Sequence, residues 1–136
     1  MRILGVDYGA QRTGLAVGDT ETGLAFPLSV LKAADCAVLA AEILKVAQSE
    51  GCEKIVVGVP KRLTGDGQPG PTQCEAMAVV LNLSTMTDLP IETEDERFTT
   101  AYAERLKREA GESVRGGADA LAAALILESY MERMKE

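Results

Sequence analysis

Acidic residues in three separate parts of the sequence are the best candidates for chemistry. Asp7 ends a short apolar segment, Asp95 and Glu96 follow another, and Asp119 opens the last apolar helix. Each also has an ordinary structural explanation, as a turn residue, a solvated strand end or a first-turn helix acid. Carboxylates from separate elements suit Mg²⁺ or Mn²⁺, since these ions take oxygen ligands and keep several waters. One or two such ions could activate a water for phosphodiester cleavage.

The composition narrows the chemistry further. The 136 residues include no His, and 21 acidic against 14 basic residues give a net charge of −7. This excludes Ser-His-Asp and Cys-His catalysis and zinc sites that use His. It also argues against nucleic-acid binding by bulk charge, although a local basic groove remains compatible with it. Any nucleic acid must be held through such a groove, a bound metal or a partner protein.

The cysteines and the apolar segments indicate a cytoplasmic protein. Cys36, Cys52 and Cys74 form no CxxC pair, so we expect three free, mostly buried thiols in a reducing compartment. The longest apolar run, Ala120–Leu127, is far shorter than the roughly 20 residues that a membrane span needs. We therefore expect no membrane segment, and a single domain over residues 1–136.

The elements that must position the acids follow from the hydrophobic periodicity. Three consecutive antiparallel strands should open the chain, and two later strands should join them in parallel, because helices connect them as crossovers. The sequence thus predicts an α/β fold with a five-stranded mixed sheet. If its first and last strands are adjacent, the three acidic positions converge at one end. The predicted segments are strands near 2–8, 13–17, 24–31, 54–60 and 90–94, helices near 35–50, 73–86, 99–109 and 118–134, and a loop over 62–72.

Residues suited to phosphate binding accompany these acids. Backbone N–H groups in glycine turns, arginines and threonine hydroxyls are frequent contacts to a phosphate backbone. The basic residues Arg105, Lys107 and Arg108 are better explained as a solvated helix face. The predicted phosphate contacts are Gly9, Arg12 and Thr13 in the first turn, Lys61 and Arg62 in the long loop, Arg97, Thr99 and Thr100 after the acidic strand, and Arg115.

The motifs in combination resemble the YqgF/RuvX family of the RNase H-like superfamily, described both as Holliday junction resolvases and as pre-16S rRNA nucleases. The resemblance covers nearly the whole chain. It is carried by GVDYG at 5–9 with RTGLAV at 12–17, VGVP at 57–60, DERFTT at 95–100 and DALAAALIL at 119–127. The segment at 113–118 departs from the family, which more often has a Lys-rich stretch there.

The resemblance implies an RNase H-like fold and divalent-metal phosphodiester hydrolysis that trims the 5′ end of pre-16S rRNA during ribosome biogenesis. Asp7, Glu96 and Asp119 then resemble the catalytic, metal-binding set. Asp95 is the alternative to Glu96, since strand alternation turns only one of the pair inward. We favour Glu96.

Other functions remain open at this point. A Holliday junction resolvase acting on branched DNA would need a homodimer for paired cuts, whereas an RNA-processing enzyme could be a monomer. A sugar or acetate kinase-like fold shares the first-strand turn but uses two such domains. A catalytically silent nucleic-acid-binding module is the third alternative. Structured RNA, pre-16S rRNA, branched DNA and ribosomal proteins are the expected partners.

Overall fold

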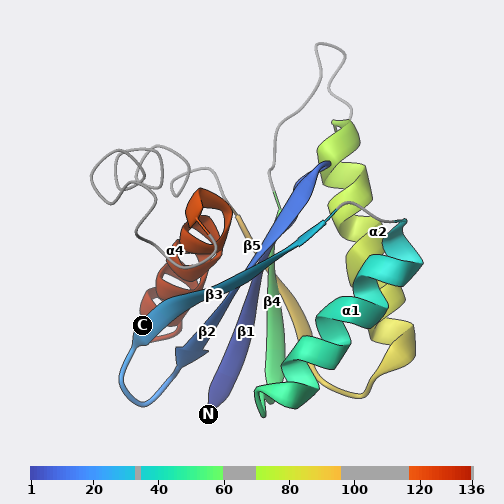
Figure 1. Ribbon diagram of the computed structural model, residues 1–136. Coiled ribbons are helices and arrows are strands. Elements are labelled where there is room, and N and C mark those ends of the chain that lie inside the picture. Colours follow the sequence, from blue (N-terminus) through green and yellow to red (C-terminus); the bar gives the residue numbers. More distant parts are fainter. Residues whose placement is uncertain (33–34, 60–69, 96–116, 136) are drawn as a thin grey trace.

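A five-stranded mixed sheet separates two layers of helices (Figure 1). A computed structural model describes residues 1–32, 35–59, 70–95 and 117–135 of the chain. Helices α1 and α2 cover one face of the sheet, and α4 covers the other. The elements are β1 (Arg2–Asp7), β2 (Arg12–Asp19), β3 (Leu24–Lys32), α1 (Cys36–Ser49), β4 (Lys54–Val59), α2 (Pro71–Met86), β5 (Ile91–Asp95) and α4 (Gly117–Met134).

The strands lie in the order β3-β2-β1-β4-β5. Strand β2 pairs antiparallel with both β1 and β3, whereas β4 runs parallel to both β1 and β5. The predicted three antiparallel strands and two parallel crossovers are confirmed. The first and last strands are not adjacent, however, because β4 lies between them.

The edge position of β3 has a local cause. Pro27 lies within this strand opposite Ala16, and the register between β2 and β3 shifts between Leu15 and Ala16. Proline donates no backbone hydrogen bond, so it is tolerated in an edge strand or at an irregularity rather than in the middle of a sheet. The edge strand that Pro27 predicted is therefore confirmed.

The helix boundaries follow from capping residues. Asp35 caps α1, since its side chain accepts a hydrogen bond of 2.9 Å from the backbone N–H of Val38. Helix α2 begins at Pro71, two residues before the predicted Gln73, because proline fits the first helical position. The prediction that the loop extends to Thr72 was therefore wrong. The helix predicted over 99–109 lies outside the described residues.

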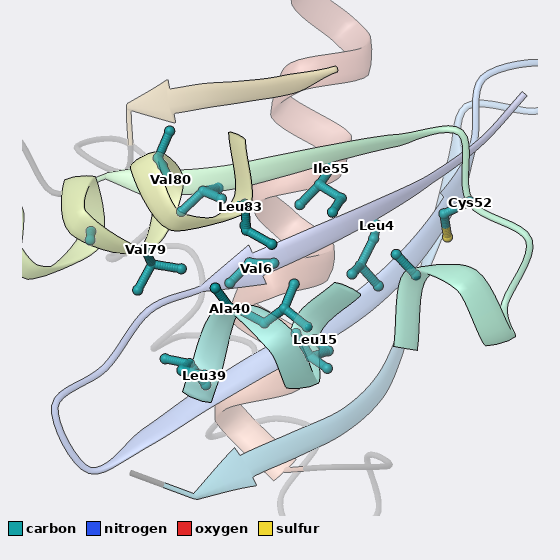
Figure 2. Packing of buried hydrophobic residues seen from close by; sticks show 14 of the residues in the cluster. Leu4, Val6, Leu15, Leu39, Ala40, Cys52, Ile55, Val79, Val80 and Leu83 are labelled. Atoms are coloured by element: carbon teal, nitrogen blue, oxygen red, sulfur yellow. The ribbon is translucent and has the colours of Figure 1, made fainter. Parts of the chain in front are cut away.

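Two apolar layers hold the helices to the sheet. Figure 2 shows the first, in which side chains of β1, β2 and β4 meet those of α1 and α2. Leu4, Val6, Leu15 and Ile55 of this layer are fully buried. The second joins α4 to the opposite face of the sheet, through residues that include Ile3, Ala16, Val56, Ala123 and Leu127. Each full burial of such a side chain stabilises the fold by about 1.5–3 kcal/mol.

The cysteines are free, but only one of the three is buried. Cys52 lies in the first apolar layer, Cys36 is half-buried and Cys74 is exposed. The expectation of mostly buried thiols was wrong for Cys74, because the first turn of α2 presents it to solvent. Among the described residues, no helix is long and apolar enough to cross a membrane.

Candidate functional site

One edge of the sheet collects the predicted acidic positions. Strands β1, β4 and β5 are parallel, so their carboxyl ends lie at this edge, where β2 begins. Helix α4 also begins there, since its first turn lies against the start of β2. Ligand sites in open α/β sheets usually lie outside the carboxyl ends of the strands. The topology therefore favours this edge as the site.

Asp7 ends β1 on the face of the sheet that α4 covers. Side chains alternate along a strand, and Ile3, on the same side as Asp7, packs in the layer beneath α4. Asp7 is half-buried, and Gly14 of β2 is its partner in the antiparallel register. The Asp7 carboxyl thus lies beside β2, at the start of α4.

Gly14 allows the first turn of α4 to lie directly against β2. A Cβ atom at position 14 would lie 1.9 Å from the backbone carbonyl oxygen of Asp119, far closer than any real contact. Only glycine fits this approach. Because Gly14 is the strand neighbour of Asp7, the packing brings Asp7 and Asp119 to the same corner of the sheet, although 112 positions separate them in the sequence.

Arg12 forms an ion pair with Asp119 at this corner. The distance between Arg12 Nε and Asp119 Oδ2 is 3.3 Å, and the two side chains are 66% and 37% exposed. The alternation of β2 puts Arg12 on the same face as Gly14, which explains why it can reach α4. An ion pair between two side chains as exposed as these contributes at most about 1 kcal/mol to stability.

Gly9 and Thr13 were also predicted to contact phosphate. A Cβ atom on Gly9 would lie 2.3 Å from the carbonyl oxygen of Arg12, so this glycine makes the tight turn between β1 and β2 possible. The Thr13 side chain is only 2% exposed and points to the opposite face from Gly14. The structure therefore gives no support to a phosphate contact by the Thr13 side chain.

Asp95 lies on the other face of the sheet from Asp7. It ends β5 opposite Val59, and Ile91 on the same side of this strand packs against the layer beneath α1 and α2. Glu92 and Glu94 occupy the intervening positions and point toward α4. Of the acids in the described part of β5, only these two share the face of Asp7.

Glu92 is bound by a lysine and a tyrosine. Its Oε2 lies 2.9 Å from Lys54 Nζ and also accepts a hydrogen bond from the Tyr130 hydroxyl. Lys54 donates a further hydrogen bond of 2.9 Å to that hydroxyl. The hydrogen bonds from Tyr130 and Lys54 hold the pKa of Glu92 below its ordinary value. Helix α4 thus supplies Tyr130 as a partner for Glu92.

Glu94 is a buried carboxylate with its own cation. It is 7% exposed, and its Oε1 lies 2.8 Å from a terminal guanidinium nitrogen of Arg133 and 3.0 Å from Arg133 Nε. Ser129 donates a third hydrogen bond, of 3.2 Å, to Oε2. The second half of α4 covers this carboxylate. Both glutamates therefore have a structural explanation.

Tyr8 is a site-edge residue that the sequence analysis did not single out. Its hydroxyl donates a 2.5 Å hydrogen bond to Glu75 in the first turns of α2. Burial, followed by this hydrogen bond and the Glu75 charge, raises the pKa of Tyr8 to about 12. The only signal in the sequence was an aromatic residue directly after Asp7, which alternation directs to the opposite face. Tyr8 thus ties the end of β1 to α2.

Several predicted site residues lie outside the described part of the chain. They are Glu96, Lys61, Arg62, Arg97, Thr99, Thr100 and Arg115.

Known proteins similar to this chain are nucleases, in agreement with the acidic residues at this corner. Residues 1–133 match a family model described as "RuvX: Holliday junction resolvase". The chain belongs to the RuvX family. It is 37% identical over 134 residues to a "Putative pre-16S rRNA nuclease" of Pseudomonas putida, covering 96% of this chain and 94% of the relative. It is 33% identical over 133 residues to a protein of the same name from Chloroflexus aggregans, with 96% and 92% covered.

A solved structure extends the comparison to the fold. RuvC of Thermus thermophilus, in complex with a Holliday junction substrate, aligns with a TM-score of 0.67 and 21% identity. The alignment covers 99% of this RuvX chain and 96% of RuvC. The predicted RNase H-like fold is therefore confirmed. With its RuvX family membership, the chain is a nuclease, a hydrolase of phosphodiester bonds.

The donor atoms at the corner fit a divalent cation. Asp7 and Asp119 of this RuvX chain supply carboxylate oxygens from two elements, the ligand type that Mg²⁺ and Mn²⁺ prefer. Within the described ranges no three acidic, cysteine or histidine residues gather into a metal-binding group. A third protein ligand would have to come from the rest of the chain, and water can complete the coordination.

Proposed function

We propose that this chain is a divalent-metal-dependent nuclease that processes the 5′ end of pre-16S rRNA in ribosome biogenesis. One observation carries the proposal: the first turn of α4 packs against Gly14, which is the strand neighbour of Asp7. Two aspartates that are far apart in the sequence thereby lie at the same corner of the carboxyl edge of the sheet. The names of the relatives from Pseudomonas putida and Chloroflexus aggregans support pre-16S rRNA as the substrate.

Asp7, Glu96 and Asp119 would hold Mg²⁺ or Mn²⁺. The alternation in β5 favours Glu96 over Asp95, because Asp95 points away from the face of Asp7. The bound ion would supply Lewis-acid stabilisation and an activated water. The protein's own part is to fix the carboxylates on rigid elements, namely the end of β1 and the first turn of α4.

Binding of the phosphate backbone would use local contacts. The net charge of −7 disfavours a general attraction for nucleic acid, so individual cations must position the substrate. Arg12 is exposed at the corner and suits this role, and Lys61 and Arg97 are proposed to join it. Ribosomal proteins are a further proposed source of affinity. We propose that residues 1–136 act as a single nuclease domain.

The test is cleavage of a pre-16S rRNA 5′ leader with and without Mg²⁺. Asp7→Asn should lower the cleavage rate by on the order of 100-fold or more, as expected when a key electrostatic group is lost. Glu53→Gln is the matched control, because it removes an exposed carboxylate before β4 at the opposite edge, and it should cleave normally. Equal cleavage by the Asp7→Asn variant would contradict the metal mechanism. RNA binding without cleavage in any divalent metal would identify a silent binding module.

Cleavage of a four-way DNA junction is the second candidate activity. The family model's description and the fold shared with RuvC favour it. Paired cuts require two active sites in a symmetric dimer. Sedimentation of the chain with a junction, together with mapping of the cut positions, separates the candidates. A dimer that makes symmetric nicks supports the resolvase, whereas a monomer that cuts only the rRNA leader supports the processing enzyme.

A further inference from the structure

We propose that Arg12 is an exchangeable counter-ion of Asp119, which a divalent cation displaces so that the guanidinium can bind the substrate's phosphate. This inference rests on the proposed metal-dependent nuclease function. It assigns Arg12 two successive partners, an internal carboxylate and an external phosphate. Arg12 is thus a positioning residue that couples metal binding to substrate binding.

The placement of Arg12 makes it a competitor for the proposed metal ligand. Its Nε lies 3.3 Å from Asp119 Oδ2. Among the residues that the structure describes, Arg12 is the ion-pair partner of Asp119, and the contact of Gly14 with the start of α4 brings the two residues close together. A cation that binds the Asp119 carboxylate would meet the positive guanidinium at short range. Like charges this close repel, so the two cannot share the carboxylate at low cost.

The ion pair has the properties of a contact that can be exchanged. Arg12 is 66% exposed, and a single nitrogen–oxygen contact joins it to Asp119. The Arg133–Glu94 pair differs, because Arg133 uses two nitrogens and its glutamate is buried beneath α4. Water can replace the lost partners at Arg12 and Asp119 but not at Glu94.

Once released from Asp119, the Arg12 guanidinium would be free to bind a phosphate group of the substrate beside Asp7. Arginine binds phosphate through a planar fork of donors. The side chain starts at the first residue of β2 and lies at the same corner as Asp7. The chain has a net charge of −7, so the substrate depends on individual cations such as Arg12. Because Arg12 is paired with Asp119 until the metal binds, only the metal-loaded protein would bind the substrate tightly.

Mn²⁺ binding to the full chain without nucleic acid tests the competition directly. Isothermal titration calorimetry on the Arg12→Ala variant should give a Kd for Mn²⁺ about fivefold lower than that of the wild type, since one opposing charge is gone. Arg12→Lys keeps the charge and should stay near the wild-type Kd. Arg2→Ala is the matched control: Arg2 forms an exposed pair of 3.3 Å with Glu50 at the opposite edge of the sheet. Its Kd should not change.

A second measurement follows the proposed release. Fluorescence anisotropy of a labelled pre-16S leader RNA should show tighter binding to the wild type with Ca²⁺ than with a chelator, Ca²⁺ serving as an oxygen-binding cation in place of Mg²⁺. This gain should shrink severalfold in Arg12→Ala, although that variant binds the metal more tightly. An affinity gain equal to that of the wild type would overturn the proposed phosphate contact.

The outcomes separate this inference from the proposed function. If the wild type binds Mn²⁺ and Asp119→Asn weakens that binding, the metal site stands. An Arg12→Ala variant with an unchanged or higher Kd for Mn²⁺ would then overturn only the role of Arg12. If the wild type binds no Mn²⁺, the metal site fails, and the exchange at Asp119 fails with it.

Discussion

Acidic residues at the two ends of helix α4 differ in their partners and in their exposure to solvent. Near its carboxyl end, Glu92 and Glu94 of β5 are each held by a cation and at least one hydroxyl group. At its amino end, Asp119 forms an exposed ion pair with Arg12 and lies beside the strand partner of Asp7. Acidic residues at both ends lie on the side of the sheet that α4 covers. The surroundings differ.

This difference separates structural acids from candidate catalytic ones. A buried glutamate with its own arginine stabilises the contact between α4 and β5, and displacing that arginine would leave an unpaired charge. A half-exposed aspartate at the carboxyl edge of a sheet can exchange its partner for a metal ion or water. An acidic cluster in a sequence therefore becomes a candidate site only where its neutralising partners are exchangeable.

A substitution at Gly14 should disrupt the amino end of α4 while leaving every acidic residue in place. Gly14→Ala places a Cβ atom against the Asp119 backbone, so α4 must shift. We expect the free energy of unfolding to fall by about 1–3 kcal/mol. We also expect cleavage to be at least tenfold slower, because the shift displaces Asp119. Gly18→Ala is the matched control, because its Cβ would lie 3.2 Å from the ends of the flexible Leu127 and Met131 side chains and no closer than 3.5 Å to backbone, at the Leu24 oxygen. Urea unfolding and a cleavage assay measure both. Equal effects of the two substitutions would contradict the special packing at Gly14.

Substitutions at the carboxyl end of α4 should lower the stability of the fold without slowing cleavage. Arg133→Ala leaves the buried Glu94 carboxylate without its cation, and we expect a loss of about 1–3 kcal/mol, discounted from a fully buried pair because Arg133 is 54% exposed. Arg12→Ala should change the unfolding free energy by less than about 0.5 kcal/mol. Urea unfolding compares the two variants. An Arg133→Ala protein that is fully folded yet inactive would show that this end also serves catalysis.

Acid should weaken the carboxyl end of α4 selectively. The folded-state pKa of Glu92 is below its ordinary value of 4.5, so its contribution is present above that pH and disappears as the pH falls through the lowered pKa. The difference in Tm between the wild type and Glu92→Gln should therefore be largest near neutral pH and shrink as the pH falls below 4.5. Thermal unfolding from pH 3 to pH 7 measures it. A difference that is independent of pH would contradict the ionic role of Glu92.

The local features of the fold could be predicted from the sequence. Short apolar runs between turn residues indicated the strands, Asp35 marked the start of α1, and Pro27 indicated an edge strand. These features depend on backbone geometry and on neighbours a few residues away, so the local sequence contains the required information. Alternation also predicts that only one residue of the Asp95–Glu96 pair shares the face of Asp7.

The roles of the acids depended on contacts between distant segments. The sequence could not show that β4 separates β1 from β5, or that Tyr130 would reach Lys54 across 76 positions. It likewise gave no sign that Arg133 would pair with Glu94, or that Gly14 would allow the start of α4 to pack beside the end of β1.

The sequence by itself thus determined which residues could do chemistry and which elements carry them, because periodicity and capping are local. Only the tertiary structure decided which carboxylates are buried with their own cation and which lie at the carboxyl edge of the sheet. The physical reason is that ion pairing and close packing depend on distances in space. Here those distances are set by the way in which α4 crosses the sheet.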